Sequence, residues 1–74
     1  MAYKEKIAVD PDIMLGKPII KGTRITVEII LRKLSEGMTI NELLEAYPHL
    51  TKENILTALS YSADVISKEE LIAT

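Results

Sequence analysis

The sequence predicts a single, mainly α-helical domain of three helices in a helix-turn-helix arrangement, with a small N-terminal β element and a short C-terminal helix. Three observations lead to this prediction. A chain of 74 residues has the length of one small domain. Apolar residues recur at helical spacing from residue 27 onward. The capping box Thr39-Ile40-Asn41-Glu42 follows Gly37 so closely that the first two helices must meet at a sharp corner.

The β element is expected over residues 5–26. Residues 5–9 alternate polar and apolar side chains, which is the period of a short strand, and Asp10-Pro11-Asp12 then favours a turn. Two further extended pieces, residues 18–20 and 24–26, flank Gly22, which supplies the positive φ that a tight turn needs.

The helix-turn-helix unit is expected over residues 27–66. The first helix begins after Thr26 as N-cap and ends at Gly37, and its apolar stripe follows the spacing i, i+3, i+4, i+7: Val27, Ile30, Leu31 and Leu34. The second helix begins at the capping box and ends at Pro48. Both helices therefore turn one aliphatic side toward a common core.

The third helix is predicted from the cap residue Thr51 to about Val65. At 100° per residue the buried line contains Ile55, Leu59, Ser62 and Ile66, and the opposite, exposed arc contains Glu53, Asn54, Thr57, Ser60, Tyr61 and Asp64. The sequence Ser67-Lys68-Glu69-Glu70 is a second capping box, which predicts a separate short helical tail over residues 67–74.

The composition excludes several classes of protein. The chain has no cysteine, so disulfide frameworks and thiolate metal sites are ruled out, and a reducing, cytoplasmic setting is expected. No apolar run approaches the length that spans a bilayer, so no membrane partner is expected. Eleven Ile, nine Leu and three Val, without Phe or Trp, predict an aliphatic core.

Catalytic chemistry has little support in the residues. There is no cysteine nucleophile, no Gly-x-Ser-x-Gly elbow and no phosphate-binding loop, and the one histidine, His49, lies in an interhelical connection without a second ligand or orienting base. Asp10 and Asp12 are explained by turn formation. We therefore expect no enzyme activity, no metal and no cofactor.

The net charge of −2 conceals a split between the two halves of the chain. Residues 1–34 hold seven basic and four acidic side chains, whereas residues 35–74 hold two basic and seven acidic ones. This +3 and −5 division favours two different partner surfaces, one for an anion and one for a cation. A solvated surface with chance clustering is the alternative.

A helix-turn-helix corner is typical of DNA-binding proteins, in which the later helix lies in the major groove. Asn54, Thr57 and Tyr61 are suitable donors and acceptors, but Glu53 and Asp64 on the same arc oppose phosphate. If DNA is bound, phosphate contacts are therefore expected mainly from residues of the basic half: Lys17, Lys21, Thr23, Arg24, Arg32 and Lys33. Lys52, at the edge of the third helix, adds one more basic side chain. A plain hairpin with solubilising cations, and a helix set that is only a packing unit, stay open as alternatives.

The run Gly16-Lys17-Pro18-Ile19-Ile20-Lys21-Gly22-Thr23-Arg24-Ile25-Thr26-Val27, with Leu34, Gly37, Tyr47-Pro48, Leu50-Thr51 and Ala58-Leu59-Ser60-Tyr61, resembles the bacterial and archaeal family called domain of unknown function 433. The resemblance covers residues 5–66. It implies a homeodomain-like helix-turn-helix fold and the role of antitoxin in a VapBC-like pair whose toxin is a PIN-like ribonuclease. The family has no firmly assigned catalytic residues, and its signature residues carry over as architecture: Gly16, Lys17, Pro18, Gly22, Thr23 and Arg24.

Two functions follow from these observations. The first is a homodimeric antitoxin that neutralises its toxin by protein contact and represses its own operon through operator DNA. The toxin contact is expected on the acidic helix and tail, at Glu53, Asp64, Glu69, Glu70, Leu71 and Ile72. The second is a stand-alone helix-turn-helix transcriptional regulator without a toxin, which would show steeply salt-dependent operator binding.

Overall fold

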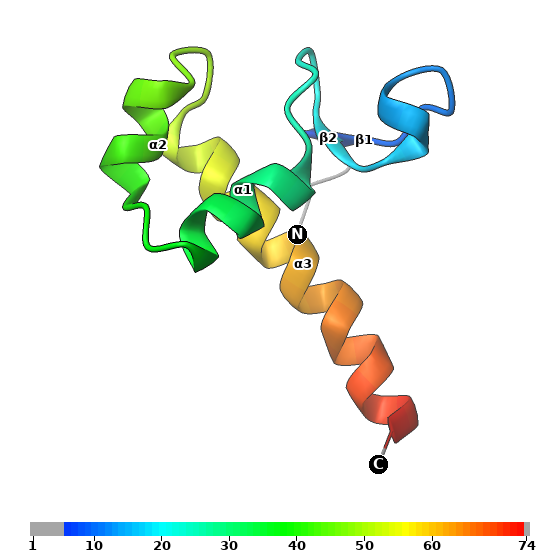
Figure 1. The fold of residues 1–74 in the computed structure, drawn as a ribbon. Helices are drawn as coiled ribbons and strands as arrows, with labels where there is room; N and C mark the ends of the chain where they lie inside the picture. The colour runs from blue at the N-terminus through cyan, green and yellow to red at the C-terminus, as the bar shows by residue number, and fades with distance from the viewer. Residues whose placement is uncertain (1–5, 74) are drawn as a thin grey trace.

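The computed structural model describes the backbone of residues 6–73 and the side chains of residues 6–68. The elements in chain order are β1 (Ile7–Ala8), a 3₁₀ turn η2 (Met14–Gly16), β2 (Ile19–Ile20), α1 (Val27–Ser35), α2 (Ile40–Ala46) and α3 (Lys52–Ala73). Figure 1 shows the three helices meeting in a compact body beside the small sheet, with the second half of α3 projecting away from it. The predicted fold class, mainly helical with a small N-terminal β element, is confirmed.

The β element is a two-stranded antiparallel sheet. Ile7 of β1 stands opposite Ile20 of β2, and Ala8 stands opposite Ile19. The predicted strand over residues 5–9 begins outside the described residues. Within them β1 ends at Ala8, shortly before the turn at Asp10, whose carboxylate Oδ1 accepts a hydrogen bond of 2.9 Å from a backbone N–H two residues further on.

A tight turn follows β2 and reverses the chain toward α1. The amide of Ile20 donates to the carbonyl of Ile25 at 2.9 Å, and Ile19 forms an antiparallel bridge with Thr26. Gly22 has a φ of +83° in this turn, as predicted. The turn therefore brings the chain back beside β2 at the residue where α1 begins.

The caps that the sequence predicts are present at α1 and α2. Thr26 Oγ1 accepts a hydrogen bond of 3.0 Å from the amide of Ile29. Thr39 Oγ1 accepts from the amide of Glu42 at 3.1 Å, and Glu42 Oε1 accepts from the amide of Thr39 at 2.8 Å, which completes the capping box. Gly37 adopts a φ of +99° at the corner between the two helices.

The core is aliphatic and draws on every element except η2. Its most buried members come from both strands, the three helices and the α2–α3 loop: Ile7, Ile20, Val27, Ile30, Leu43, Leu50, Ile55 and Ala58. Tyr47 and Tyr61 are partly buried and pack against this cluster. Each fully buried aliphatic side chain stabilises the fold by about 1.5–3 kcal/mol relative to an exposed one, so this cluster is the main source of stability.

The orientation of α3 differs from the prediction. Thr57 is only 2% exposed and Ala58 is fully buried, whereas Leu56 and Leu59 are 48% and 37% exposed. The prediction that Thr57 lies on the exposed arc, and that Leu59 lies on the buried line, is wrong. The small side chain of Ala58 lets the α3 backbone approach the core cluster, so α3 is rotated about its axis and presents its larger leucines outward.

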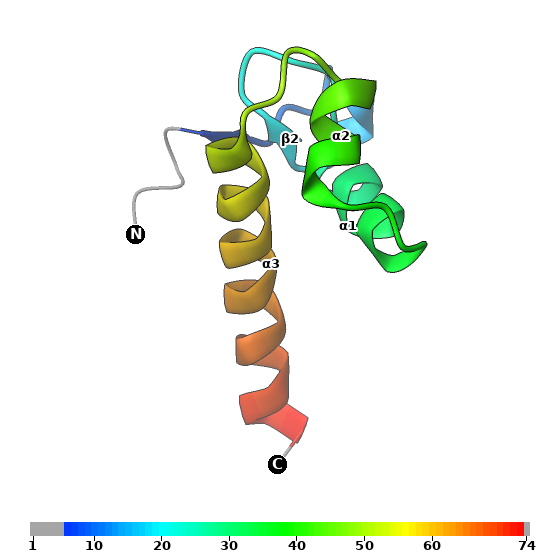
Figure 2. The ribbon, with the colours of Figure 1, turned by 90° about the vertical axis from the view of Figure 1, so that its left-hand side faces the viewer.

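The C-terminal helix is continuous with α3. The second capping box predicts a break at Ser67, but α3 runs without interruption from Lys52 to Ala73. No glycine or proline follows Pro48 in the sequence, so nothing disfavours helix at the expected break. Figure 2 shows the result, a single long helix whose C-terminal half extends beyond the body.

Candidate functional site

The segment from Gly16 to Arg24 holds two basic side chains in fixed places. Gly16 closes η2 with a φ of +80°, and Lys17 follows it in extended conformation at the start of the hairpin. After Gly22 the hydroxyl of Thr23 donates to the carbonyl of Ile20 at 2.8 Å and accepts from the following hairpin arm at 3.0 Å. Thr23 therefore braces the turn that carries Arg24, and its hydroxyl is already engaged within the turn.

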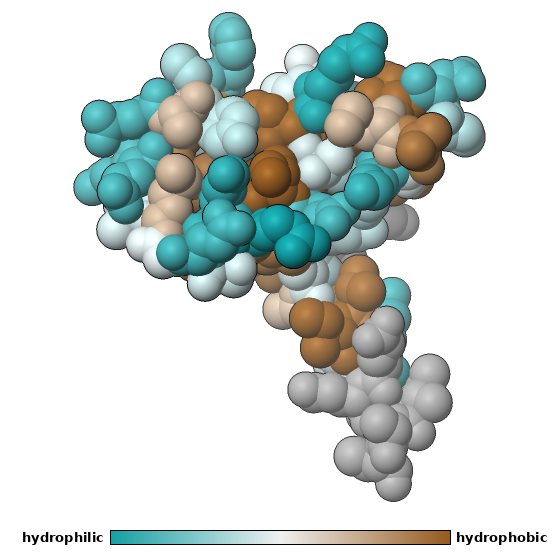
Figure 3. Space-filling model, viewed as in Figure 1, coloured by the Kyte–Doolittle hydropathy of each residue, from teal (hydrophilic) through white to brown (hydrophobic). Residues whose placement is uncertain are grey.

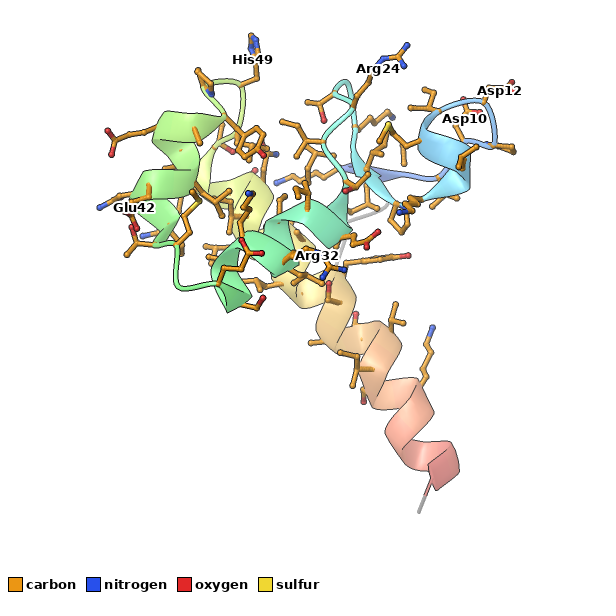
Figure 4. All side chains as sticks on the ribbon, in the orientation of Figure 1. Asp10, Asp12, Arg24, Arg32, Glu42 and His49 are labelled. Carbon is orange, nitrogen blue, oxygen red and sulfur yellow. The ribbon has the colours of Figure 1, made fainter. Side chains whose placement is uncertain are left out.

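Three of the basic residues predicted to bind nucleic acid come together in one pocket. Lys17, Arg24 and Arg32 line a hollow of about 400 Å³, together with Met14, Ile25, Thr26, Glu28, Ile29 and Tyr47. They come from the segment between η2 and β2, the hairpin turn and α1, and Figure 4 shows Arg24 near the tip of the hairpin and Arg32 on the flank of α1. We call this hollow the cationic pocket.

Glu28 organises the charges of the cationic pocket. Its two carboxylate oxygens accept from Lys17 Nζ at 2.7 Å and from Arg32 Nη2 at 3.1 Å. The hydrogen bond from Lys17, followed by the one from Arg32, lowers the pKa of Glu28, so this carboxylate is ionised near neutral pH. Three cations and one carboxylate leave a net charge of +2, which suits an anionic ligand.

Arg24 is the most available cation of this pocket. Its side chain is exposed, and among the residues that the structure describes it forms no ion pair. It also lines a second, open hollow of about 620 Å³ with Lys21 and His49. In Figure 4 Arg24 and His49 point out of the same end of the molecule, so the hairpin turn and the α2–α3 loop form one basic end.

The remaining residues predicted to bind nucleic acid are dispersed. Lys33 lies 4.0 Å from Glu36 at the end of α1, and Lys52 is exposed at the first turn of α3. Asn54 forms a reciprocal cap: its Oδ1 accepts from the amide of Thr51 at 3.0 Å, and its own amide donates to Thr51 Oγ1 at 3.0 Å. Since Thr57 is buried as well, few side chains at the start of α3 are available to read bases.

The residues predicted to bind a protein partner lie along α3. Glu53 forms an ion pair with Lys6 of the N-terminal segment, and Asp64 is exposed on the next part of the helix. The others lie on the helix by their backbone, and their side chains are outside the described residues: Glu69, Glu70, Leu71 and Ile72. These positions therefore share one element, α3, that is separate from the cationic pocket.

An apolar groove runs between α1 and α3, and it was not predicted from the sequence. It has a volume of about 510 Å³, and its apolar lining combines both helices with the residue before β2: Pro18, Val27, Leu31, Tyr61, Val65 and Ile66. Tyr61, predicted to lie on the exposed arc, stands in this groove and packs against the core edge. Glu28 and Arg32 line both this groove and the cationic pocket, so the two hollows adjoin at α1, one mainly apolar and the other charged.

Sequence reasoning also missed Glu28 and Tyr47 as pocket residues. The spacing of Glu28 and Arg32, four apart on one helix, is a signal that could have indicated their ion pair. Within the described part of the chain, no group of three or more His, Cys, Asp or Glu side chains is placed to hold a metal. Among the same residues, no helix is long and apolar enough to cross a membrane.

The fold and the site define a small helix-turn-helix protein whose β-hairpin carries a cationic pocket. The family model described as "Protein of unknown function (DUF433)" matches residues 7–62, from β1 to the middle of α3. The chain belongs to this DUF433 family.

Two relatives place the chain in context. It is 34% identical over 61 residues to an uncharacterized protein, y4eO, of Sinorhizobium fredii (strain NBRC 101917 / NGR234), a match that covers 82% of this chain and 28% of that protein. The chain thus spans little more than a quarter of this curated relative. A crystal structure of a DUF433 member protein from Anabaena variabilis has a TM-score of 0.79 and 30% identity, over 93% of this chain and 69% of that one.

Proposed function

We propose that this DUF433 protein is the homodimeric, non-enzymatic antitoxin of a type II toxin–antitoxin pair in the cytoplasm, and that it neutralises a PIN-like ribonuclease by direct contact. One observation carries the proposal: a small chain presents two unlike surfaces, a cationic pocket at the hairpin and a projecting helix with exposed acidic and apolar side chains. Such a division suits a protein that meets an anion at one end and a protein at the other.

The toxin contact is assigned to α3. A ribonuclease that handles RNA tends to present a positive face, and the half of this chain that contains α3 carries the net charge of −5. Asp64 is exposed on the projecting helix, next to the apolar groove that Val65 helps to line. A positively charged partner helix with an apolar side would match both features.

Copurification tests the toxin contact. The tagged protein is expressed with the product of the adjacent gene, and the captured proteins are identified by mass analysis. Asp64→Lys should abolish capture, whereas Asp12→Lys, an equal charge change in the loop after β1, should leave it intact. Equal capture by Asp64→Lys and the unaltered protein would show that α3 is not the contact. Failure of the unaltered protein to capture any nuclease would remove the antitoxin function.

Operator binding is the second part of the proposal. If the protein binds an operator but no toxin, its function is the alternative one, that of a stand-alone transcriptional regulator. The +2 charge of the cationic pocket favours it, and the occupied cap at Asn54 and the burial of Thr57 favour contacts to phosphate over contacts to bases. The hairpin turn with Lys21 and Arg24 is the expected DNA contact.

Salt-dependent binding to the DNA upstream of the gene tests this part. Each lost phosphate contact lowers the salt slope by about 0.9, which is about 3.5-fold in affinity over a fourfold rise in salt concentration. Arg24→Ala should lower the slope by this amount, whereas Lys33→Ala, outside the pocket, should change it less. Identical slopes for the two variants would exclude the pocket as the DNA contact.

A further inference from the structure

An exposed apolar stripe follows α3, and Ile66 at its C-terminal end also borders the apolar groove between α1 and α3. Leu56, Leu59 and Ile66 are 48%, 37% and 53% exposed, and Ala63 between them is exposed too. Their spacing of three, four and three residues is that of a helix that packs along another helix. Figure 3 shows apolar side chains gathered on α3 where it leaves the body. We call these four residues the α3 stripe.

The chain exposes more surface than a compact monomer of its mass. A compact monomer of 8.3 kDa exposes about 4,600 Å², whereas this chain exposes 5316 Å². The difference of roughly 700 Å² belongs to the whole chain, and a second copy packed along α3 would cover part of the exposed surface. The radius of gyration, 12.7 Å, also exceeds the ~11 Å expected for a compact chain of this length.

We propose that the α3 stripe binds the α3 stripe of a second copy, with the two helices antiparallel about a two-fold axis near residue 61. The inference rests on the homodimer of the proposed function and names its interface. In this register Leu56 of one copy meets Ile66 of the other, and Leu59 meets Ala63. The two central layers each pair a large side chain with a small one, so the helices can approach closely.

Charge selects the antiparallel arrangement. Lys52 is exposed one turn before Leu56 on the same stripe, and position 70, a glutamate, continues the stripe one turn after Ile66. The antiparallel register places Lys52 opposite position 70 of the second copy at both ends of the seam. A parallel pair would instead place lysine opposite lysine and glutamate opposite glutamate, which costs stability.

The oligomeric mass of the purified full chain tests the interface without toxin or DNA. Sedimentation equilibrium should give twice the chain mass of 8.3 kDa, and Ile66→Glu and Leu59→Glu should each give the mass of one chain. Leu15→Glu is the matched control, because Leu15 is 94% exposed and outside the stripe. Ile66 lies beyond the core cluster, so its variant keeps the helical circular dichroism of the unaltered protein. A monomeric unaltered chain, or a dimeric Ile66→Glu variant, overturns the proposal.

Charge reversal tests the register. Lys52→Glu and Glu70→Lys should each weaken the dimer, and the double variant should restore it, because only the antiparallel register brings these two positions together. Failure of the double variant to recover the dimer refutes the register. A dimer that captures no nuclease would keep this interface and remove only the antitoxin function, so the two proposals fail separately.

Discussion

Replacement of Gly22 by alanine should cost about 1 kcal/mol of folding free energy. Gly22 has a φ of +83°, and a Cβ built there would meet no atom within 4 Å, so crowding contributes nothing. The cost is the backbone strain of an L-residue in the left-handed region, roughly 1–2 kcal/mol, reduced by the lower entropy of an unfolded chain with alanine. For a domain of this size, 1 kcal/mol lowers Tm by about 4–8 °C.

Thermal unfolding followed by circular dichroism measures this loss, and two variants isolate its cause. Gly22→Asn should recover part of the lost Tm, because asparagine tolerates positive φ better than alanine does. Gly37→Ala should lose a similar amount, because Gly37 has a φ of +99° and is equally open. A Gly22→Ala protein as stable as the unaltered one would refute the left-handed turn and with it the placement of Arg24.

Three further predictions concern the core, α3 and acid stability. Ile30→Ala should cost about 2–5 kcal/mol in urea unfolding, because Ile30 is fully buried, whereas a much smaller loss would argue against this core. Thr57→Val should leave any DNA affinity unchanged, because Thr57 is buried, and weakened DNA binding would contradict this position. The free energy of unfolding should change by no more than about 1 kcal/mol, the contribution of one hydroxyl hydrogen bond. Hydrogen bonds from Lys17 and Arg32 lower the pKa of Glu28, and those from Thr39 lower the pKa of Glu42. The two ionised carboxylates therefore stabilise the fold above about pH 4.3, the ordinary pKa of glutamate, and this stabilisation is lost as pH falls through the lowered pKa values. Urea midpoints should therefore drop in acid, and less so in Glu42→Gln; equal drops in both proteins would contradict this.

The local features of the fold were predictable because single residues determine them. Gly22 and Gly37 occupy conformations that other residues rarely adopt, and Thr39 with Glu42 forms a cap whose two hydrogen bonds are both local. These signals depend on neighbours within four residues. Tertiary packing did not alter them.

The orientation of α3 depends on distant neighbours and was predicted incorrectly. Its apolar side chains lie on two sides of the helix, so periodicity alone does not say which side is buried. The choice is made by close packing: Ala58 fits against the core, while Leu56 and Leu59 remain outside. The cationic pocket was only partly predictable for the same reason. Glu28 binds Arg32, four residues away on the same helix, but it also binds Lys17, which is 11 residues earlier in the chain and reaches it only through the fold.

The scarcity of aromatic residues gives the protein built-in spectroscopic reporters. The chain has no tryptophan, so tyrosine emission is not masked. Tyr47 lines the cationic pocket and Tyr61 lines the apolar groove. With selectively labelled tyrosine, one nuclear magnetic resonance titration can follow both hollows in a single sample. Tyr47→Phe and Tyr61→Phe identify their two signals among those of the three tyrosines, the third being Tyr3 outside the described residues. Anion binding and protein binding can thus be distinguished without attaching a foreign probe.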